Sequence, residues 1–349
     1  MPALAVADAL RDSGAEVSFL GARGRSEQEL VPAAGYEIDL LDVRGLDRRN
    51  PARAAAAAWL AARGVARART ILRRRGVEAV LGGGGYVAGP AGVAAISLRL
   101  PLVLTEADRH LGLANRLLAP RARRVCLAFP VPGRSGDRYL VTGRPVPAAI
   151  AAADREAARR RFGIAAGDRC LLVFGGSQGA RSINLAALDA FAGPEAESPH
   201  RDYHVLHISG GRDFAEVEGR LAAGGPPPRY TLLAYEQGLA DALAASDLVL
   251  ARAGGSIFEI AAAGRPAILV PYPYASARHQ HANAEWMADA GAAIVIEDAD
   301  LDGARLRAAV AELLADSDRL ERMGAASVSL ARPEAARAVA DELLAAAAG

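Results

Sequence analysis

The sequence alternates short apolar runs with longer alanine-rich stretches, and this alternation constrains the fold more than any other feature. The apolar runs lie at residues 16–21, 77–85, 100–108, 169–177, 203–211, 246–255 and 266–273. Strands that alternate with helices form βαβ units with parallel sheets, and strands that are apolar throughout are covered by helices on both faces. The pattern therefore predicts an α/β protein built from doubly wound parallel sheets.

Length and one proline- and glycine-rich segment predict two domains. The chain has 349 residues, which is more than one hydrophobic core usually serves. The segment at 129–150 separates two groups of apolar runs, so we place the boundary between domains at 1–143 and 144–332. Ligands of open α/β sheets bind beyond the carboxyl ends of the strands, and we expect the site in a cleft between the domains.

Composition excludes several classes of protein. Hydrophobic residues make up 52% and charged residues 23% of the chain, which predicts a folded protein without long disordered regions. A net charge of +1 gives no global attraction to nucleic acid, and we expect no such partner. No apolar run approaches the roughly 20 residues of a membrane span, and the N-terminus does not read as a secretion signal. Cys126 and Cys170 lack metal-ligand spacing, which is typical of a reducing cytoplasm.

The stretch LLVFGGSQGARSIN, residues 171–184, predicts an anion site. Gly175, Gly176 and Ser177 follow a strand expected at 171–174 and precede a helix expected from Gln178. A turn of this kind presents unpaired backbone N–H groups at the positive end of a helix, where phosphate binds readily. The alternative is a glycine-rich turn that serves only to reverse the chain.

A second stretch, residues 248–264, repeats this layout with Gly254, Gly255 and Ser256 ahead of a helix expected from Ile257. Two such turns at neighbouring strand ends can grip one diphosphate. Glu259 in the first helical turn either holds a ribose diol or completes a capping box. The sequence contains neither a Walker loop nor a complete dinucleotide fingerprint, which argues against ATP hydrolysis and nicotinamide cofactors.

Polar side chains cluster after the strand expected at 267–270. His279, Gln280, His281 and Asn283 lie in the following loop and face the same cleft. The amides of Gln280 and Asn283 both donate and accept hydrogen bonds, as the recognition of sugar hydroxyls requires. The two histidines have no third ligand at a recognisable spacing, so we expect no zinc.

Together these motifs resemble the MurG family of GT-B glycosyltransferases, glycosyltransferase family 28. The resemblance covers essentially the whole chain and rests on GGSQGARSIN, RAGGSIFEIAAAG, PAILVPYP, HQHANA, GGGGYVAGPAGVAA, GLANRLLAP and GYEIDLLDVRGL. It implies a GT-B fold of two Rossmann-like domains. It also implies inverting transfer of N-acetylglucosamine from UDP-N-acetylglucosamine (UDP-GlcNAc) to the muramyl 4-hydroxyl of undecaprenyl-diphospho-N-acetylmuramoyl-pentapeptide (lipid I). The reaction yields lipid II for peptidoglycan, at the cytoplasmic face of the bacterial cell membrane.

The resemblance further implies a division of labour between the domains. Residues 1–143 would bind the acceptor and the membrane, 144–332 would bind UDP-GlcNAc, and a helix at 333–349 would cross back to the first domain. The implied donor-binding residues are Asp108, Arg144, Gly176, Ser177, Gln178, Tyr235, Glu236, Gly254, Gly255, Ser256, Ile257, Glu259, Gln280 and Asn283. The implied acceptor and membrane residues are Gly84, Gly85, Tyr86, Asn115, Trp59 and Leu60.

Three departures from the family pattern stand out. Family members begin with a strand and a G-G-T-G-G-H loop ahead of a P-A-L-A-V-A helix, whereas this sequence opens at MPALAVADAL. We therefore expect the first, central strand of the N-terminal sheet to be missing, and Met1 to be an internal methionine of a longer reading frame. The family's H-E-Q-N reads TEAD here, with Thr105 and Asp108 replacing His and Asn, and Pro147 replaces an arginine that Arg144 could substitute.

The residues leave the general base open. Glu106 and Asp108 follow an apolar run and are the candidates to take the proton of the acceptor hydroxyl. The alternative is that they are solvated loop acids or caps for a helix that begins near Gly112. Helix ends would stabilise the charge on the leaving UDP. We find no Asp-x-Asp motif at the end of an expected strand, so we expect no metal and no cofactor.

The segment 50–76 carries Trp59 and Leu60 among many arginines, which fits either a peripheral contact with anionic lipid or an ordinary helix with a solvated basic face. Other functions remain open at this point. They are an isomerase similar to UDP-GlcNAc 2-epimerase, another GT-B transferase for lipids or natural products, and an inactive fragment that binds the donor.

Overall fold

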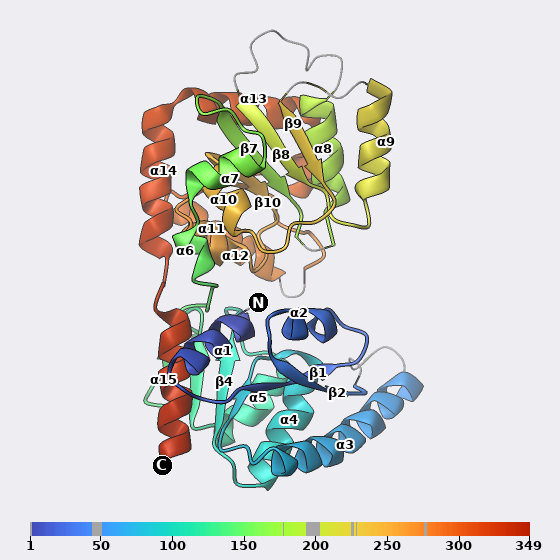
Figure 1. Ribbon diagram of the computed structural model, residues 1–349, viewed down its shortest axis with the longest axis vertical. Helices are drawn as coiled ribbons and strands as arrows, with labels where there is room; N and C mark the ends of the chain where they lie inside the picture. The colour runs from blue at the N-terminus through green and yellow to red at the C-terminus, as the bar shows by residue number, and fades with distance from the viewer. Residues whose placement is uncertain are drawn as a thin grey trace. The chain divides into compact units, whose positions relative to one another are not determined.

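The computed structural model describes residues 2–43, 51–176, 178–192, 203–224, 227, 229–275 and 278–349, without the side chains of 51–58. The chain forms two compact units (Figure 1). Unit 1 comprises Met1–Pro147 and Arg332–Gly349, and unit 2 comprises Ala148–Ala331. The division after Pro147 lies close to the boundary at Gly143 that the sequence predicts.

Unit 1 is a parallel α/β unit. Its strands are β1 (Ser18–Ala22), β2 (Glu37–Leu41), β3 (Val80–Gly82), β4 (Leu102–Glu106), β5 (Arg124–Leu127) and β6 (Tyr139–Val141). Its helices are α1 (Pro2–Asp12), α2 (Glu27–Ala33), α3 (Pro51–Arg74), α4 (Gly85–Ser97), α5 (Leu113–Leu118), the 3₁₀ turn η1 (Ala119–Arg121) and α15 (Ala335–Ala348).

Unit 2 is a second parallel α/β unit. Its strands are β7 (Arg169–Phe174), β8 (Tyr203–Ile208), β9 (Tyr230–Leu233), β10 (Leu248–Ala251), β11 (Ala267–Leu269) and β12 (Ala293–Val295). Its helices are α6 (Ala149–Ala152), α7 (Arg155–Arg161), α8 (Arg181–Phe191), α9 (Phe214–Gly224), α10 (Ala240–Ala245), α11 (Ile257–Ala262), α12 (His279–Asp289), η4 (Asp298–Asp300), α13 (Gly303–Ala315) and α14 (Ser317–Leu330).

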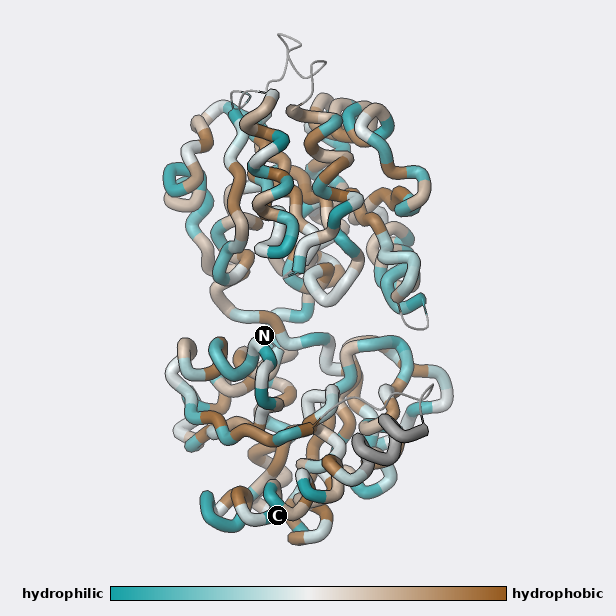
Figure 2. The backbone as a smooth tube through the Cα atoms, turned by 90° about the vertical axis from the view of Figure 1, so that its right-hand side faces the viewer, coloured by the Kyte–Doolittle hydropathy of each residue, from teal (hydrophilic) through white to brown (hydrophobic). Residues whose placement is uncertain are grey.

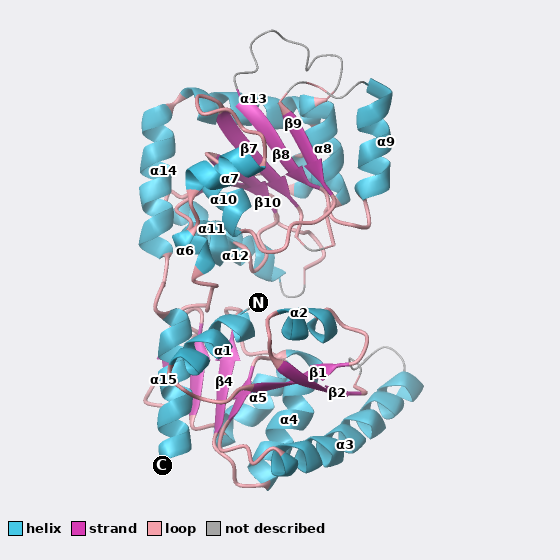
Figure 3. Cartoon of the chain, viewed as in Figure 1, coloured by secondary structure: helices cyan, strands magenta, loops and turns pink. Residues whose placement is uncertain are grey.

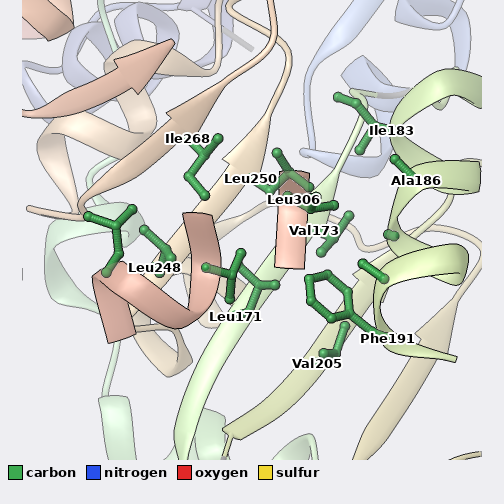
Figure 4. Close-up of a cluster of buried hydrophobic side chains, with 14 of the residues drawn as sticks. Leu171, Val173, Ile183, Ala186, Phe191, Val205, Leu248, Leu250, Ile268 and Leu306 are labelled. Carbon is green, nitrogen blue, oxygen red and sulfur yellow. The ribbon is translucent and has the colours of Figure 1, made fainter. Parts of the chain in front are cut away.

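The sheet of unit 2 is continuous. Its six strands pair in the order β12-β11-β10-β7-β8-β9, and every pairing is parallel. Leu171, Val173, Leu248, Leu250 and Ile268 point from the strands into one core beneath α8 and α13 (Figure 4). The chain runs from β7 toward β9 on one side and returns through β10 toward β12 on the other. The strand order therefore reverses between β7 and β10, where doubly wound sheets bind ligands.

The sheet of unit 1 is interrupted. β1 pairs only with β2, while β3, β4, β5 and β6 form a separate four-stranded parallel sheet (Figure 3). A cavity of about 1400 Å³ is lined by β1 and β3, by α1 and α15, and by α3 and α4. Since both strands and the helices of both faces line it, the cavity lies within the sheet, between β1 and β3.

The C-terminal helix α15 belongs to unit 1. It packs against α1 and β4, and its Val339, Ala340 and Leu343 join Val6 and Leu10 of α1 in one apolar cluster. The Arg124 guanidinium lies 2.9 Å from the Glu342 carboxylate and ties α15 to β5. Hydrophobic stretches of the backbone run through the interior of each unit (Figure 2). No helix in the described ranges is long and apolar enough to cross a membrane.

All seven apolar runs contain strands, but five further strands were not predicted. Four of these five, β2, β6, β9 and β12, close an end of their sheet. An edge strand is covered less completely than a central one and needs fewer apolar residues, as the half-buried β9 and the largely exposed β6 show. The fifth, β5, is a short interior strand with two arginines just before its apolar residues.

Candidate functional site

The two glycine turns lie next to each other in unit 2. β7 and β10 are hydrogen-bonded neighbours, with Phe174 opposite Ala251 at their carboxyl ends. Because the pairing is parallel, the turns that follow the two strands leave the same edge of the sheet side by side. The adjacency that a shared diphosphate site requires is therefore present.

The first turn differs in one respect from the prediction. Helix α8 begins at Arg181 and not near Gln178, because Gly176 and Gly179 have φ values of 93° and 77°, a left-handed conformation that no helix continues. The Gly179 N–H donates to the Gly176 carbonyl at 2.9 Å and closes the turn. Gly176 and Gln178 are exposed, and no hydrogen bond of the described residues occupies their N–H groups. Ser177 lies outside the described residues.

The second turn matches the prediction, since α11 begins at Ile257. The N–H groups of Gly254, Gly255 and Ser256 have no acceptor among the hydrogen bonds of the described chain. The Ser256 hydroxyl makes no capping hydrogen bond, so one half of the capping box proposed for Glu259 is missing. Glu259 is half-buried in the first turn of α11, beside these free donors.

Gln280 and Asn283 lie in helix α12, which begins at His279, and not in the loop that the sequence predicts, and their surroundings differ. The Gln280 Oε1 accepts a hydrogen bond from the Tyr272 N–H at 2.9 Å, and its Nε2 lies 3.8 Å from the point where a Cβ on Gly254 would stand. Gln280 therefore sits at the second turn. Asn283 is buried, and its Nδ2 donates to the Ala253 carbonyl at 3.0 Å. Its geometry indicates that Asn283 anchors the loop, whereas the sequence analysis assigned it to sugar recognition.

Arg252 is a residue that the sequence analysis missed. Its guanidinium lies 2.5 Å from the Asp298 carboxylate and donates to the Ser182 hydroxyl at 2.7 Å. It also donates to the carbonyls of Val270 and Pro271, so it joins the ends of β10 and β11 to α8. An arginine two positions before a glycine turn is the signal that was available in the sequence.

An Asp-Ala-Asp sequence, 298–300, follows β12, a strand that was not predicted. The sequence predicted no Asp-x-Asp motif at the end of a strand, whereas the folded chain has one shortly after β12. Asp298 is occupied by Arg252 and also accepts a hydrogen bond from the Ser182 hydroxyl at 2.7 Å. No cluster of three metal-ligating side chains occurs in the part of the chain that the structure describes.

Tyr235 and Glu236 follow β9, at the end of the same sheet edge. Tyr235 is half-exposed at 50%. Glu236 accepts two hydrogen bonds from Arg161 at 2.8 and 2.9 Å, and these bonds raise the pKa of the Arg161 guanidinium. The carboxylate of Glu236 is thereby engaged, and its main chain is the part left for a ligand.

Glu106 and Asp108 differ sharply in unit 1. Glu106 is buried, and its carboxylate accepts from the N–H groups of Ala107, Asp108 and Gly112 and from the Asn115 Nδ2 at 2.8–3.3 Å. This geometry favours the capping alternative, because the oxygens that a base must offer are already occupied. The side chain of Asp108 is half-buried and has no hydrogen bond or ion pair among the described residues.

Asn115 is buried beside Glu106 in helix α5. Its Nδ2 donates to the Thr105 carbonyl at 2.8 Å and to Glu106 at 3.0 Å, and its Oδ1 has no hydrogen-bond donor. The sequence analysis assigned Asn115 to the acceptor. Its contacts indicate that it holds the loop that carries Asp108 in place.

The glycine loop after β3 opens on the large cavity of unit 1. Gly84 and Gly85 have φ values of 80° and 73°, and a Cβ at either position would meet no atom within 4 Å. Tyr86 is 53% exposed, with the Arg25 guanidinium 5.6 Å from its ring centre. Arg144 lines the same cavity and belongs to unit 1, although the sequence analysis grouped it with the donor-binding domain.

Helix α3 carries the predicted membrane residues. Trp59 is 58% exposed, and the Arg63 guanidinium lies 4.7 Å from its ring centre, whereas Leu60 is half-buried. Leu113 and Leu117 of α5 are also exposed. Exposed aromatic and aliphatic side chains near arginines are typical of a protein that touches anionic lipid, although solvated helices also carry them.

Comparison with known proteins agrees with this architecture. The glycosyltransferase family 28 N-terminal domain matches residues 1–127, and the family 28 C-terminal domain matches residues 170–341. The UDP-N-acetylglucosamine--N-acetylmuramyl-(pentapeptide) pyrophosphoryl-undecaprenol N-acetylglucosamine transferase of Rubrobacter xylanophilus is 41% identical over 98% of this chain and 98% of its own. The transferase of the same name from Acidithiobacillus ferrooxidans is 42% identical over 97% and 92%.

Solved structures give the same result. The crystal structure of Acinetobacter baumannii MurG is 28% identical, with a TM-score of 0.72 over 99% of this chain and 95% of that chain. A putative UDP-N-acetylglucosamine 2-epimerase from Listeria monocytogenes reaches a TM-score of 0.68 at 16% identity, over 96% and 91%, which shows a shared fold alone. From the two family domains and the full-length relatives, we conclude that this chain belongs to glycosyltransferase family 28, the MurG family.

Proposed function

We propose that the protein transfers N-acetylglucosamine from UDP-GlcNAc to the 4-hydroxyl of the N-acetylmuramoyl group of lipid I, with inversion at the anomeric carbon. The observation that carries this proposal is the side-by-side placement of two N–H-rich turns after β7 and β10. The names of relatives that match nearly the whole chain supply the reaction. The product would be lipid II.

In this proposal unit 2 holds the donor. The N–H groups of Gly176 and Gln178, together with those of Gly254, Gly255 and Ser256, bind the two phosphates. The Ile257 N–H, which the family resemblance also implies, donates to the Gly254 carbonyl at 3.3 Å. Helix α11 has only six residues, so direct N–H donors contribute more than a helix dipole does. Glu259 accepts hydrogen bonds from the ribose diol, and the Gln280 Nε2 donates to the sugar. The main chain near Tyr235 contacts the uracil.

The chemistry requires two things of the protein. As the bond between the sugar and the phosphate breaks, UDP gains negative charge, and fixed N–H donors stabilise that charge without reorganising. The acceptor hydroxyl must lose its proton as it attacks the anomeric carbon. We assign the general base of this chain to Asp108, because its carboxylate makes no hydrogen bond or ion pair with the described residues, whereas that of Glu106 accepts four hydrogen bonds. The family pattern has Asn at this position, so the assignment concerns this chain and not the family.

Unit 1 would bind the acceptor and the membrane. We place the acceptor at the Gly83–Gly85 loop and Tyr86, near Asp108 at the carboxyl ends of β3 and β4. Arg144 would neutralise a phosphate. Trp59, with Leu113 and Leu117, would rest on the cytoplasmic face of the membrane, where lipid I is presented. No nucleic acid and no cofactor enter this scheme.

A turnover assay with product analysis tests the proposal. The purified protein is incubated with radiolabelled UDP-GlcNAc and lipid I in detergent, and lipid and sugar fractions are separated. We expect label in a lipid-linked disaccharide and release of UDP. An epimerised UDP-sugar without lipid I would favour the isomerase alternative. Binding of UDP-GlcNAc without any product would favour a protein that only binds the donor.

A further inference from the structure

A buried chain of polar side chains lies behind the first glycine turn of unit 2. His207 of β8 is fully buried, with Nδ1 2.7 Å from the Tyr230 hydroxyl and Nε2 3.0 Å from the Asn184 Oδ1. Asn184 of α8 is also fully buried, and its Nδ2 donates to the Ser209 carbonyl and to the Asp213 Oδ2, each at 3.0 Å. Hydrogen bonds between side chains thus run without a break from Tyr230 through His207 and Asn184 to Asp213.

The partners fix the direction of each hydrogen bond. The two groups that face the Asn184 Nδ2 are a carbonyl and a carboxylate, which only accept, so the amide oxygen must face His207. His207 Nε2 therefore carries the proton, and Nδ1 accepts from the Tyr230 hydroxyl. Burial lowers the pKa of His207 to about 3, which keeps the imidazole neutral and this single tautomer in place.

The chain ends at the wall of the glycine turn. A Cβ on Gly179 would lie 2.2 Å from the Ser209 carbonyl oxygen and 3.2 Å from the Asp213 Oδ2, the two groups that Asn184 holds. A Cβ on Gly210 would lie 2.3 Å from the Gly179 nitrogen. The turn therefore rests directly on Ser209, Gly210 and Asp213, and any shift of these groups must move Gly179.

We propose that His207 and Asn184 are positioning residues for the first glycine turn: the hydrogen bond between them locks the Asn184 amide, which holds Ser209 and Asp213 against Gly179, so that Gly176 and Gln178 keep their N–H groups directed at the ligand. This inference rests on the proposed function for the identity of the ligand. The conformation of the turn itself is independent of that identity. A buried histidine that merely fills the core would have no such effect on the turn.

His204 provides a matched control on the same strand. It is also buried in β8, and its Nε2 bonds the Thr231 hydroxyl at 2.8 Å. It stands three positions before His207, and side chains alternate along a strand, so the two side chains leave opposite faces of the sheet. Thr231 in turn contacts the Phe162 carbonyl, away from the turn. His204→Leu removes a buried histidine from the same strand without touching Asn184.

The experiment compares His207→Leu, His207→Gln and His204→Leu in the full chain. UDP affinity is measured by calorimetry, and the amide signals of Gly176 and Gly179 are recorded by NMR without ligand. We expect His207→Leu to weaken UDP binding about tenfold or more and to move both signals. Glutamine restores a donor toward Asn184 and should keep affinity within about threefold. His204→Leu should leave affinity and both signals close to wild type.

Equal UDP affinity and unchanged turn signals in His207→Leu would overturn the proposal, whatever its melting temperature. If His207→Leu does not fold, Asn184→Ala takes its place, since alanine suits a helix and removes the same hold on Ser209 and Asp213. A wild-type protein that fails to bind UDP would refute the proposed donor. The ligand-free NMR signals would still decide the positioning role.

Discussion

Both units are parallel α/β units, but only the sheet of unit 2 is uninterrupted. In unit 2 six strands pair without a break, and the turns after β7 and β10 become neighbours through that pairing. In unit 1 the strands split into sets of two and four, and a cavity of about 1400 Å³ separates β1 from β3. In unit 2, hydrogen bonds between neighbouring strands place the two glycine turns side by side. In unit 1, the two separate sheets are joined by the packing of helices.

The gap has a physical cost. The edges of β1 and β3 that face the cavity have no strand partner among the described residues, and apolar residues of α1 and α15 line the same space. Unpaired strand edges attract other strands, and apolar side chains that face an empty space lose packing contacts. Asp108 lies in the loop after β4 and Tyr86 in the first turn of α4, so both side chains belong to this interrupted unit.

The largest effect on activity should come from Asp108→Asn, because the proposed function puts the general base in unit 1 and donor binding in unit 2. Loss of a general base lowers kcat by about 10²–10⁴-fold. UDP affinity should be unchanged. Steady-state kinetics with lipid I, together with calorimetry, measures both quantities.

Glu106→Gln is the matched control for this substitution. It places an amide against N–H donors and should destabilise unit 1 by about 1–3 kcal/mol. A protein with Asp108→Asn that keeps wild-type kcat would remove Asp108 from the mechanism.

Filling the gap should produce the largest gain in stability. An extended segment of five or six apolar residues, joined through a short glycine-rich turn to Pro2, can pair with both β1 and β3. Each buried side chain stabilises the protein by about 2 kcal/mol, and ordering each residue of the segment costs about 1–2 kcal/mol, so these two contributions nearly cancel. The backbone hydrogen bonds to β1 and β3 should then leave a net gain of about 3 kcal/mol.

Hydrogen exchange of the β1 and β3 amides, alongside urea unfolding, tests this expectation. A segment of equal length made of glycine and serine serves as control. Equal protection and equal unfolding with the apolar and the control segments would show that the cavity does not accept a strand.

Gly175→Ala tests the other side of the comparison. A Cβ at this position would lie 2.2 Å from the Ala180 nitrogen, so the turn after β7 must open. We expect UDP affinity to fall about tenfold while unit 1 unfolds as before. Gly211→Ala is the control, because a Cβ there meets no atom within 4 Å and the residue follows the neighbouring strand β8. Equal affinity in both variants would break the link between the turn and the donor.

A smaller effect concerns pH and unit 2 alone. His207 has a pKa of about 3 in the folded chain against an ordinary 6.5, so between these values the unfolded chain binds one more proton. Its contribution to stability is constant above pH 6.5 and falls by about 1.4 kcal/mol per pH unit below it. Urea unfolding at pH 7, 6 and 5 should show a steeper loss for wild type than for His207→Gln. Parallel pH profiles would mean that His207 is not buried as a neutral ring.

Much of this architecture could be predicted from apolar periodicity and glycine placement, including the strands in the seven apolar runs and the start of α11 at Ile257. The edge strands could not, because partly exposed strands such as β9 lack a continuous apolar signal. The start of α8 was misplaced because sequence does not reveal that Gly179 adopts positive φ. Glu106 and Asn283 hold neighbouring loops through hydrogen bonds, whereas we assign Asp108 and Gln280 to the ligands. These hydrogen bonds join residues that the fold brings together, so the sequence motifs alone do not reveal them.

One measurement tests the shared diphosphate site most directly. The full chain, labelled with ¹⁵N, is titrated with UDP while the amide signals of Gly176, Gly254 and Gly255 are followed by NMR. We expect the signals of both turns to move together along one binding curve with one dissociation constant. Movement of a single turn, or two curves with different constants, would contradict the claim that the ends of β7 and β10 form one site.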